Sequence, residues 1–365
     1  MKLNITEPTL LLDNDKCLAN IRAMAEKAKT NDLILRPHFK THQSREIGRW
    51  FRPFGVNKIT VSSLKMAEYF AEDGWSDITV AFPVNVLEIE RINALAGKIQ
   101  LNLLVESVEA VKLLLKGLIH PVALFLKIDT GNRRTGINPN NKTIINAILE
   151  IIEASNLLEC KGFLSHAGHS YKSNGKAAIK KVHQESKGLM VGVKQAYLDR
   201  YPGLIASIGD TPSCSTMDDF DGIDEIRPGN YVFYDLTQWG IGACTLDEIA
   251  VALACPVVAK HSDRSEIVVY GGGVHFSKDR ALFPNSEDIY FGLVVEMENV
   301  GWKIPKQPSI IKALSQEHGV IKATAELFEK TNVGDILTIL PVHSCMSVDL
   351  MESYLTLDGR AISKL

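Results

Sequence analysis

The chain has 365 residues, which is enough for a large barrel and a smaller second domain. Its 45% hydrophobic and 23% charged residues are typical of globular proteins and argue against a disordered or fibrous chain. The net charge of −3, without any run of five or more basic residues, argues against binding to nucleic acid or to an anionic membrane surface. Chemistry on a small molecule is therefore the favoured class of function.

The start of the chain and the cysteines predict a cytoplasmic protein. The first twelve residues lack the basic and then apolar layout of a signal peptide, and no stretch reaches the roughly 18 apolar residues of a membrane span. The cysteines occur singly, without CxxC spacing, and are expected to be reduced thiols. They are Cys17, Cys160, Cys214, Cys244, Cys255 and Cys345.

Eight short β-branched or apolar runs alternate with amphipathic segments in the first two-thirds of the chain. The runs cover residues 33–39, 58–63, 77–82, 100–105, 122–129, 160–166, 204–209 and 224–227. Segments with apolar residues at helical spacing lie between them, such as 44–51, 64–73, 86–96 and 107–118. This alternation predicts an α/β fold with a parallel sheet, and eight such units predict a (β/α)8 TIM-type barrel over residues 13–234.

The last third of the chain predicts a second domain that is rich in β-strands. After residue 234, strand-like runs are separated by turn residues; they include 248–260, 266–271, 335–342 and 353–357. We therefore assign residues 235–365 to a C-terminal β-rich domain. Residues 1–12 are expected to join it, because the short run 8–12 precedes the first helix instead of following one.

The first run ends in RPHFKTH, residues 36–42, which places Lys40 at the carboxyl end of a strand. Barrel enzymes carry their reactive groups at these strand ends. A lysine in the mouth of a barrel can form a Schiff base with a carbonyl compound. The alternative interpretation is a solvated lysine at a strand end, so the other strand ends must decide.

Two further strand ends carry groups that suit an anion or an aromatic cofactor. The fifth run leads into DTGNRRTG, residues 129–136, where flanking glycines let Arg134 approach an anion. The sixth leads into SHAGHSY, residues 165–171, which brings His166 and Tyr171 close together in the sequence. A structural histidine is the alternative interpretation, but its clustering with a second histidine and a tyrosine at a strand end favours a site.

The turns after the seventh and eighth runs predict a phosphate site. Thr211 follows the seventh run, and Gly229 and Asn230 follow the eighth. Barrels commonly bind phosphate with the loops after these two strands. Ordinary tight turns would use the same residue types, and they remain the alternative.

The segment PVHSC, residues 341–345, predicts a metal-binding pair. It lies in a strand-like run, where alternation places His343 and Cys345 on one face, so that imidazole and thiolate can share a cation such as Zn²⁺. Two protein ligands leave positions open, which suits catalysis better than a structural role. The alternative is a buried thiol beside a hydrogen-bonded histidine.

Taken in order, segments 36–42, 166–171 and 343–345 resemble the D-threonine aldolase and D-serine dehydratase family. Its members are enzymes of pyridoxal 5'-phosphate (PLP), fold type III, with an alanine-racemase-like barrel followed by a β domain. The resemblance covers essentially the whole chain.

The resemblance implies a role for each candidate residue. Lys40 would carry PLP as a Schiff base and act, once released, as the proton-transfer base; His343 and Cys345 would hold a divalent metal, Zn²⁺ or Mn²⁺. The remaining residues would contact the cofactor: Arg134 at the ring oxygen, His166 and Tyr171 along the ring, and Thr211, Gly229 and Asn230 at the phosphate through backbone amides.

The function expected from this resemblance is a PLP- and metal-dependent lyase acting on 3-hydroxy-D-amino acids. PLP would act as an electron sink at Cα and the metal as a Lewis acid at the β-hydroxyl, for either dehydration or aldol cleavage. Some aldolases of the family have aspartate in place of Cys345, so the His-x-Cys form is more similar to the dehydratases. A homodimer is also implied. The alternatives are a PLP-dependent amino-acid racemase and a non-catalytic PLP-binding protein.

Overall fold

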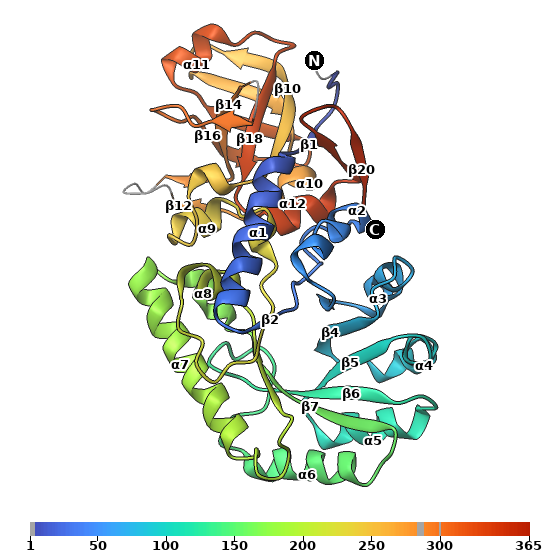
Figure 1. Ribbon diagram of the computed structural model, residues 1–365. Helices are drawn as coiled ribbons and strands as arrows, with labels where there is room; N and C mark the ends of the chain where they lie inside the picture. The colour runs from blue at the N-terminus through green and yellow to red at the C-terminus, as the bar shows by residue number, and fades with distance from the viewer. Residues whose placement is uncertain (1–3, 283–287, 299–300) are drawn as a thin grey trace. The chain divides into compact units, whose positions relative to one another are not determined.

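The computed structural model describes residues 4–282, 288–298 and 301–365, and it divides the chain into two compact units (Figure 1). The β unit comprises Met1–Arg22, Thr41–Ile47 and Asn230–Lys364. The barrel unit comprises Ala23–Lys40 and Gly48–Gly229, with Leu365. The sequence predicts boundaries after residues 12 and 234, whereas the chain passes between the two units at more places than these. Residues 1–3, which the sequence analysis placed in the second domain, lie outside the described residues.

The barrel unit contains an eight-stranded parallel sheet in the order β2-β9-β8-β7-β6-β5-β4-β3. Its strands are β2 (Ile34–Leu35), β3 (Ile59–Val61), β4 (Asp77–Pro83), β5 (Gln100–Val105), β6 (Val122–Lys127), β7 (Leu158–Leu164), β8 (Ile205–Ile208) and β9 (Glu225–Ile226). A parallel bridge between His38 and Thr60 joins the two ends of this order, with the Phe39 N–H donating to Thr60 O at 2.8 Å. The predicted α/β barrel fold is confirmed.

Helices follow the strands along the outer side of this sheet, where α3 to α7 succeed one another in Figure 1. They are α3 (Leu64–Ala71), α4 (Ile89–Ala96), α5 (Val108–Gly117), α6 (Lys142–Glu153) and α7 (Lys176–Gln195), and the short α8 (Thr211–Thr216) comes after β8. Polar caps begin several of them: Ser63 Oγ accepts from the Met66 N–H and Ser107 Oγ from the Ala110 N–H, both at 3.2 Å. Such caps satisfy amides that have no partner within the helix.

The interior of the barrel unit holds a chain of polar contacts. Arg36, which is 0% exposed, donates from Nε to Glu225 Oε2 and from a terminal nitrogen to Asp77 Oδ1, both at 2.6 Å. Ser207 Oγ donates to the second oxygen of Glu225 at 2.6 Å and accepts from Arg227 Nε at 2.7 Å. Because buried charges are costly unless they are paired, these contacts fix the strands that carry them relative to one another.

The β unit is built on a closed antiparallel ring of strands. The ring runs β10-β11-β17-β16-β14-β18 and returns to β10. Its strands are β10 (Val251–His261), β11 (Glu266–Tyr270), β14 (Gly292–Met297), β16 (Ile310–Leu314), β17 (His318–Lys322) and β18 (Ile336–Pro341). The predicted C-terminal β domain is therefore an antiparallel barrel.

Beside β10, three further strands extend this ring, and one of them comes from the start of the chain. β1 (Thr9–Leu12) pairs antiparallel with β10 and parallel with β19 (Ser353–Thr356), which pairs with β20 (Ala361–Ser363). The segment Thr41–Ile47 also belongs to this unit, since Tyr354 Oη donates to His42 O at 2.5 Å and Gln43 Nε2 to Asp349 Oδ1 at 2.7 Å.

The prediction that one strand runs through residue 342 and carries His343 and Cys345 on one face was wrong. β18 ends at Pro341, and α12 (Ser344–Leu350) follows at once, with His343 at its N-cap position. The Ser344 N–H donates to Asp235 Oδ2 at 3.0 Å, and Val342 O accepts from the Thr237 N–H at 3.1 Å. These contacts from a distant segment turn the chain out of the sheet.

The thiols and the helices bear on the predicted compartment. All six cysteines are free, as expected for reduced thiols. Among the helices of the described residues, none is long and apolar enough to cross a membrane.

Gly162 provides a test of the β7 packing. A Cβ atom there would lie 2.0 Å from Ile205 O on the neighbouring strand, and its φ of +148° disfavours a side chain. Gly162→Ala should therefore lower the melting temperature of the protein by several degrees. Gly188→Ala is the matched control: it lies within α7 with open space around it, so we expect a gain of about 1 kcal/mol. Calorimetry that gives the same shift for both variants would contradict this account.

Candidate functional site

Lys40 lies at the carboxyl end of the first barrel strand, directly after the bridge that closes the sheet. The preceding residue, Phe39, is fully buried, and its ring centroid lies 5.0 Å from that of Phe51, 4.9 Å from Phe70 and 5.1 Å from Trp75. This aromatic cluster fixes the backbone that presents Lys40, while the Lys40 side chain is exposed. A rigid base with an accessible amine is what a covalent attachment site requires.

Positive charge is concentrated in the barrel unit around Lys127, the last residue of β6. Burial and the neighbouring Arg227 and Arg134 cations lower the pKa of Lys127 to about 7. Burial likewise lowers the pKa of His166 to about 3, helped by Lys127, Lys40 and Arg134, although a hydrogen bond with Gly209 O opposes it. These shifts show that the predicted residues Lys40, Arg134 and His166 share one electrostatic environment, which favours an anion.

A single carboxylate, that of Asp129, holds the loop that carries Arg134 through hydrogen bonds to its backbone. Asp129 Oδ1 accepts from the Gly131 and Arg133 N–H groups, both at 3.0 Å. Gly136 has a φ of +118°, and a Cβ atom there would lie 2.6 Å from Asp129 N. The glycine-flanked sequence therefore folds the loop tightly back on the strand end.

Tyr171 and Thr211 continue this group of predicted residues. The Tyr171 and His166 ring centroids are 6.1 Å apart, and the Thr211 N–H donates to Tyr171 Oη at 3.2 Å. The Thr211 amide therefore already has an acceptor. The Thr211 side chain remains available, because its Oγ1 is buried and has no hydrogen-bond partner within the described residues. A buried hydroxyl beside a cationic cluster fits an oxygen of a cofactor phosphate.

The barrel-unit residues therefore fit PLP. They supply the Lys40 amine for a covalent bond and the cations around Lys127 for the phosphate and the ring oxygen of the cofactor. They also supply the neutral imidazole of His166 beside the ring of Tyr171. Gly229 is the last residue of the barrel-unit segment Gly48–Gly229, whereas Asn230 belongs to the β unit. The contacts of the Asn230 side chain lie in the β unit.

His343 and Cys345 lie together at the start of α12, with Cys345 in contact with two other side chains of the β unit. Its Sγ lies 3.3 Å from Thr41 Oγ1 and 3.5 Å from Asn230 Nδ2. The Asn230 amide also donates to Asp235 Oδ2 at 2.6 Å and to Ser344 Oγ at 3.0 Å. The side chain of Asn230 thus supports the loop of the predicted metal ligands.

The donor set of this pair fits a divalent metal. Although burial opposes it, a hydrogen bond and charge interaction with Cys345, and the carboxylates of Asp235 and Asp279, raise the pKa of His343 to about 10. The negative electrostatic potential around His343, which stabilises its proton, would also stabilise a metal cation bound in place of that proton. No group of three or more His, Cys, Asp or Glu residues suited to a metal occurs within the described ranges.

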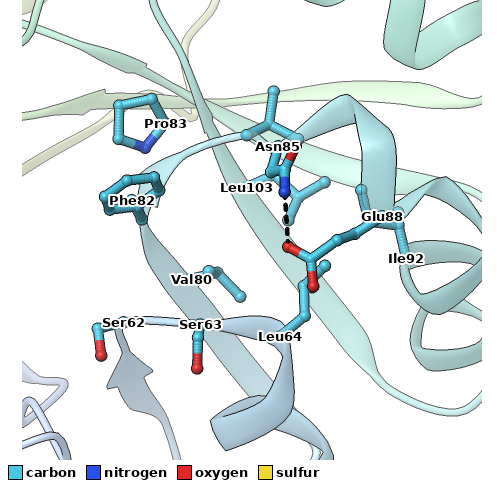
Figure 2. Close-up of a pocket in the computed structure, with 11 residues that line it drawn as sticks. Ser62, Ser63, Leu64, Val80, Phe82, Pro83, Asn85, Glu88, Ile92 and Leu103 are labelled. Atoms are coloured by element: carbon cyan, nitrogen blue, oxygen red, sulfur yellow. Dashed lines mark hydrogen bonds between the residues drawn. The ribbon is translucent and has the colours of Figure 1, made fainter.

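A separate hollow of about 270 Å³ lies at the carboxyl ends of β3 and β4 (Figure 2). Leu64, Val80, Phe82 and Leu103 supply much of its apolar lining. Its one ionisable lining residue, Glu88, accepts from Asn85 Nδ2 at 3.1 Å. None of the predicted site residues lines it, so we assign it no chemistry.

Several residues of the two sites escaped the sequence analysis. Lys127 carried a usable signal, a lysine that ends an otherwise apolar run. The others, Arg227, Asp235, Asp279 and Thr41, come from segments whose proximity no local pattern reveals.

Two family models match successive parts of the chain. The family model described as alanine racemase, N-terminal domain, matches residues 12–236. The model described as putative serine dehydratase domain matches residues 250–357.

Individual relatives span the whole chain. The D-threo-3-hydroxyaspartate dehydratase of Delftia sp. (strain HT23) is 28% identical over 98% of this chain and 96% of its own length. The D-serine dehydratase of Dictyostelium discoideum is 29% identical over 96% of this chain and 93% of its own. A solved structure of a D-threo-3-hydroxyaspartate dehydratase mutant in the metal-free form has a TM-score of 0.89 and 26% identity, covering 100% of this chain and 99% of that one.

The barrel match alone covers more than half of the chain, and the second match follows it in sequence. This order confirms the family predicted from the three motifs. The chain belongs to the alanine racemase N-terminal domain family, among the members that carry a serine dehydratase domain after the barrel.

Proposed function

We propose that this protein is a PLP- and divalent-metal-dependent lyase that acts on 3-hydroxy-D-amino acids. The observation that carries the proposal is the presence of two complementary centres: Lys40 in a cationic environment in the barrel unit, and His343 with Cys345 in the β unit. The names of the two relatives, both dehydratases of such substrates, support it.

When bound, PLP withdraws electrons from the substrate Cα, and a divalent metal supplies Lewis acidity for a departing or ionising β-hydroxyl. The task of Lys40 is then to hold the cofactor covalently and, once exchanged for the substrate amine, to take the proton from Cα. Its exposed side chain on a rigid backbone suits both tasks.

The surrounding residues bind and orient. Arg134 and Arg227 offer permanent positive charge to anionic oxygens, and Thr211 Oγ1 offers a hydroxyl donor. His166 remains neutral at physiological pH because of its lowered pKa, so it can pack against an aromatic ring without adding charge. In the β unit, His343 and Cys345 would hold a divalent metal, and two protein ligands would leave positions open for water and substrate, as in catalytic sites.

Two other functions compete with the lyase. A PLP-dependent racemase shares the barrel family, but it has no evident use for the His343/Cys345 pair. A non-catalytic PLP-binding protein would likewise not need a metal. The proposal also includes Zn²⁺ or Mn²⁺ as the metal and the homodimer that the resemblance implies. The six free thiols support a cytoplasmic location.

The covalent role of Lys40 is tested by substitution. Lys40→Ala should abolish the visible absorbance of the lysine-bound cofactor and lower lyase activity by several orders of magnitude. Lys112→Ala, which removes an exposed lysine from α5, should change neither. A persistent cofactor spectrum in Lys40→Ala would show that another residue carries PLP.

Product analysis tests the reaction. The protein supplied with PLP and Zn²⁺ or Mn²⁺ should convert D-serine, D-threonine or D-threo-3-hydroxyaspartate, and a chelator or His343→Ala should stop the conversion. A 2-oxo acid with ammonia identifies a dehydratase, and glycine with an aldehyde identifies an aldolase. Loss of optical activity alone, insensitive to chelation, would replace the lyase with a racemase.

The buried Lys127 predicts a pH dependence of stability. Its pKa is about 7 in the folded chain and near 10.5 when unfolded, so between these values the unfolded state binds the extra proton and stability rises with pH. Lys127→Met removes this effect. In cofactor-free protein, the melting temperature of Lys127→Met relative to wild type should therefore be higher at pH 7 than at pH 9.5. A difference that does not vary with pH, as expected for the exposed control Lys112→Met, would contradict the assignment.

A further inference from the structure

His343 makes a second contact that metal binding alone does not explain. Its Nδ1 atom lies 2.6 Å from Asp279 Oδ2, a residue 64 positions earlier in the chain. The side chains of His343 and Asp279 are 38% and 49% exposed. An ion pair this exposed contributes little to stability, so its value must be sought in the orientation of the imidazole.

The backbone around Asp279 is shaped to present its carboxylate. Asp279 follows α10 (Gly273–Phe276), and Ser347 Oγ of α12 donates to Phe276 O at 3.1 Å, which joins the two helices. Between them, Ser277 adopts a left-handed φ of +66°, and its Oγ accepts from the Asp279 N–H at 3.1 Å. A serine held in this unfavourable conformation indicates that the surrounding structure determines the turn.

Close packing also fixes the start of this segment. A Cβ atom at Gly271 would lie 2.5 Å from Cys255 Sγ, and one at Gly272 would lie 2.3 Å from Gln316 O. The chain can therefore approach the β10 and β17 side of the ring only with glycine at these positions. The position of Asp279 is thus set from both α12 and the sheet.

The chemistry of the contact follows from the two nitrogens of imidazole. A carboxylate that accepts from Nδ1–H fixes the tautomer in which Nε2 carries the lone pair, and it raises the basicity of that nitrogen. The same contact fixes the plane of the ring. His343 would then keep Nε2 available as the metal ligand, and it also interacts with Cys345.

We propose that Asp279 is a positioning residue that orients His343 for metal binding. The inference rests on the proposed function, in which His343 and Cys345 hold the divalent metal. Asp235 supports the residue next to Cys345, since its Oδ2 accepts from the Ser344 N–H, and it also accepts from Asn230 Nδ2. Asp279 differs in that it is exposed, so that its removal need not disturb the core.

The experiment measures Zn²⁺ affinity of the PLP-loaded, full-length protein by competition with a chromophoric chelator. Asp279→Ala should weaken Zn²⁺ binding roughly 10- to 100-fold, and Asp279→Asn by less, because its amide oxygen still accepts from Nδ1–H. The control is Asp349→Ala, which removes an exposed carboxylate from α12 that contacts Gln43 and not His343; it should leave the affinity unchanged. Cofactor absorbance and melting temperature should be the same in all four proteins.

A second series separates the possible failures. In a His343→Ala background, Asp279→Ala should have no further effect on Zn²⁺ affinity. If wild type binds Zn²⁺ no better than His343→Ala, the metal assignment in the proposed function fails. If His343→Ala loses the metal but Asp279→Ala matches Asp349→Ala, the inference alone fails. It fails as well if Asp279→Ala lowers the melting temperature and cofactor binding together with Zn²⁺ affinity, because the carboxylate would then serve the fold.

Discussion

The barrel unit depends on a guanidinium that has no access to solvent. Arg36 is paired at 2.6 Å with Glu225, which is equally buried, and at 2.6 Å with Asp77. Leaving any one of these charges without its partner inside the barrel would cost several kcal/mol, so the strands that carry them have little freedom to shift. Arg36 precedes Lys40 by four residues on the same strand end. The position of the Lys40 amine is therefore a consequence of how the barrel interior is neutralised.

The same polar chain reaches the cationic cluster. Glu225 holds Ser207, Ser207 accepts from Arg227, and Arg227 in turn lowers the pKa of Lys127. Clustered cations lower the stability of the folded state unless an anion is bound, because like charges repel and burial disfavours each charged group. We expect the cofactor to be part of the folding energetics of this unit, since ligands that bind only the folded state stabilise it.

In the β unit, the charged groups that act on His343 include two carboxylates, those of Asp235 and Asp279. Asp235 is fully buried and accepts hydrogen bonds from the Gln238 and Ser344 backbone and from Asn230, which leaves it satisfied without a cation. Asp279 is exposed and bonds His343. One carboxylate therefore shapes the loop and the other contacts the imidazole of His343, and negative potential of this kind is favourable to a cation.

The sequence predicts what is local and misses what is brought together by folding. The eight barrel strands were recognisable because apolar runs and amphipathic segments alternate, and Lys40 and Arg134 became candidates because they follow strand ends, where barrels commonly carry function. The strand assignment at His343 failed because the helix there is begun by Asp235, 109 residues from Ser344. Lys127 was overlooked because a lysine that ends a buried strand has the pattern of an ordinary strand edge. Its neighbours Arg134 and Arg227 lower its pKa, and their proximity is a property of the closed sheet that no single segment encodes.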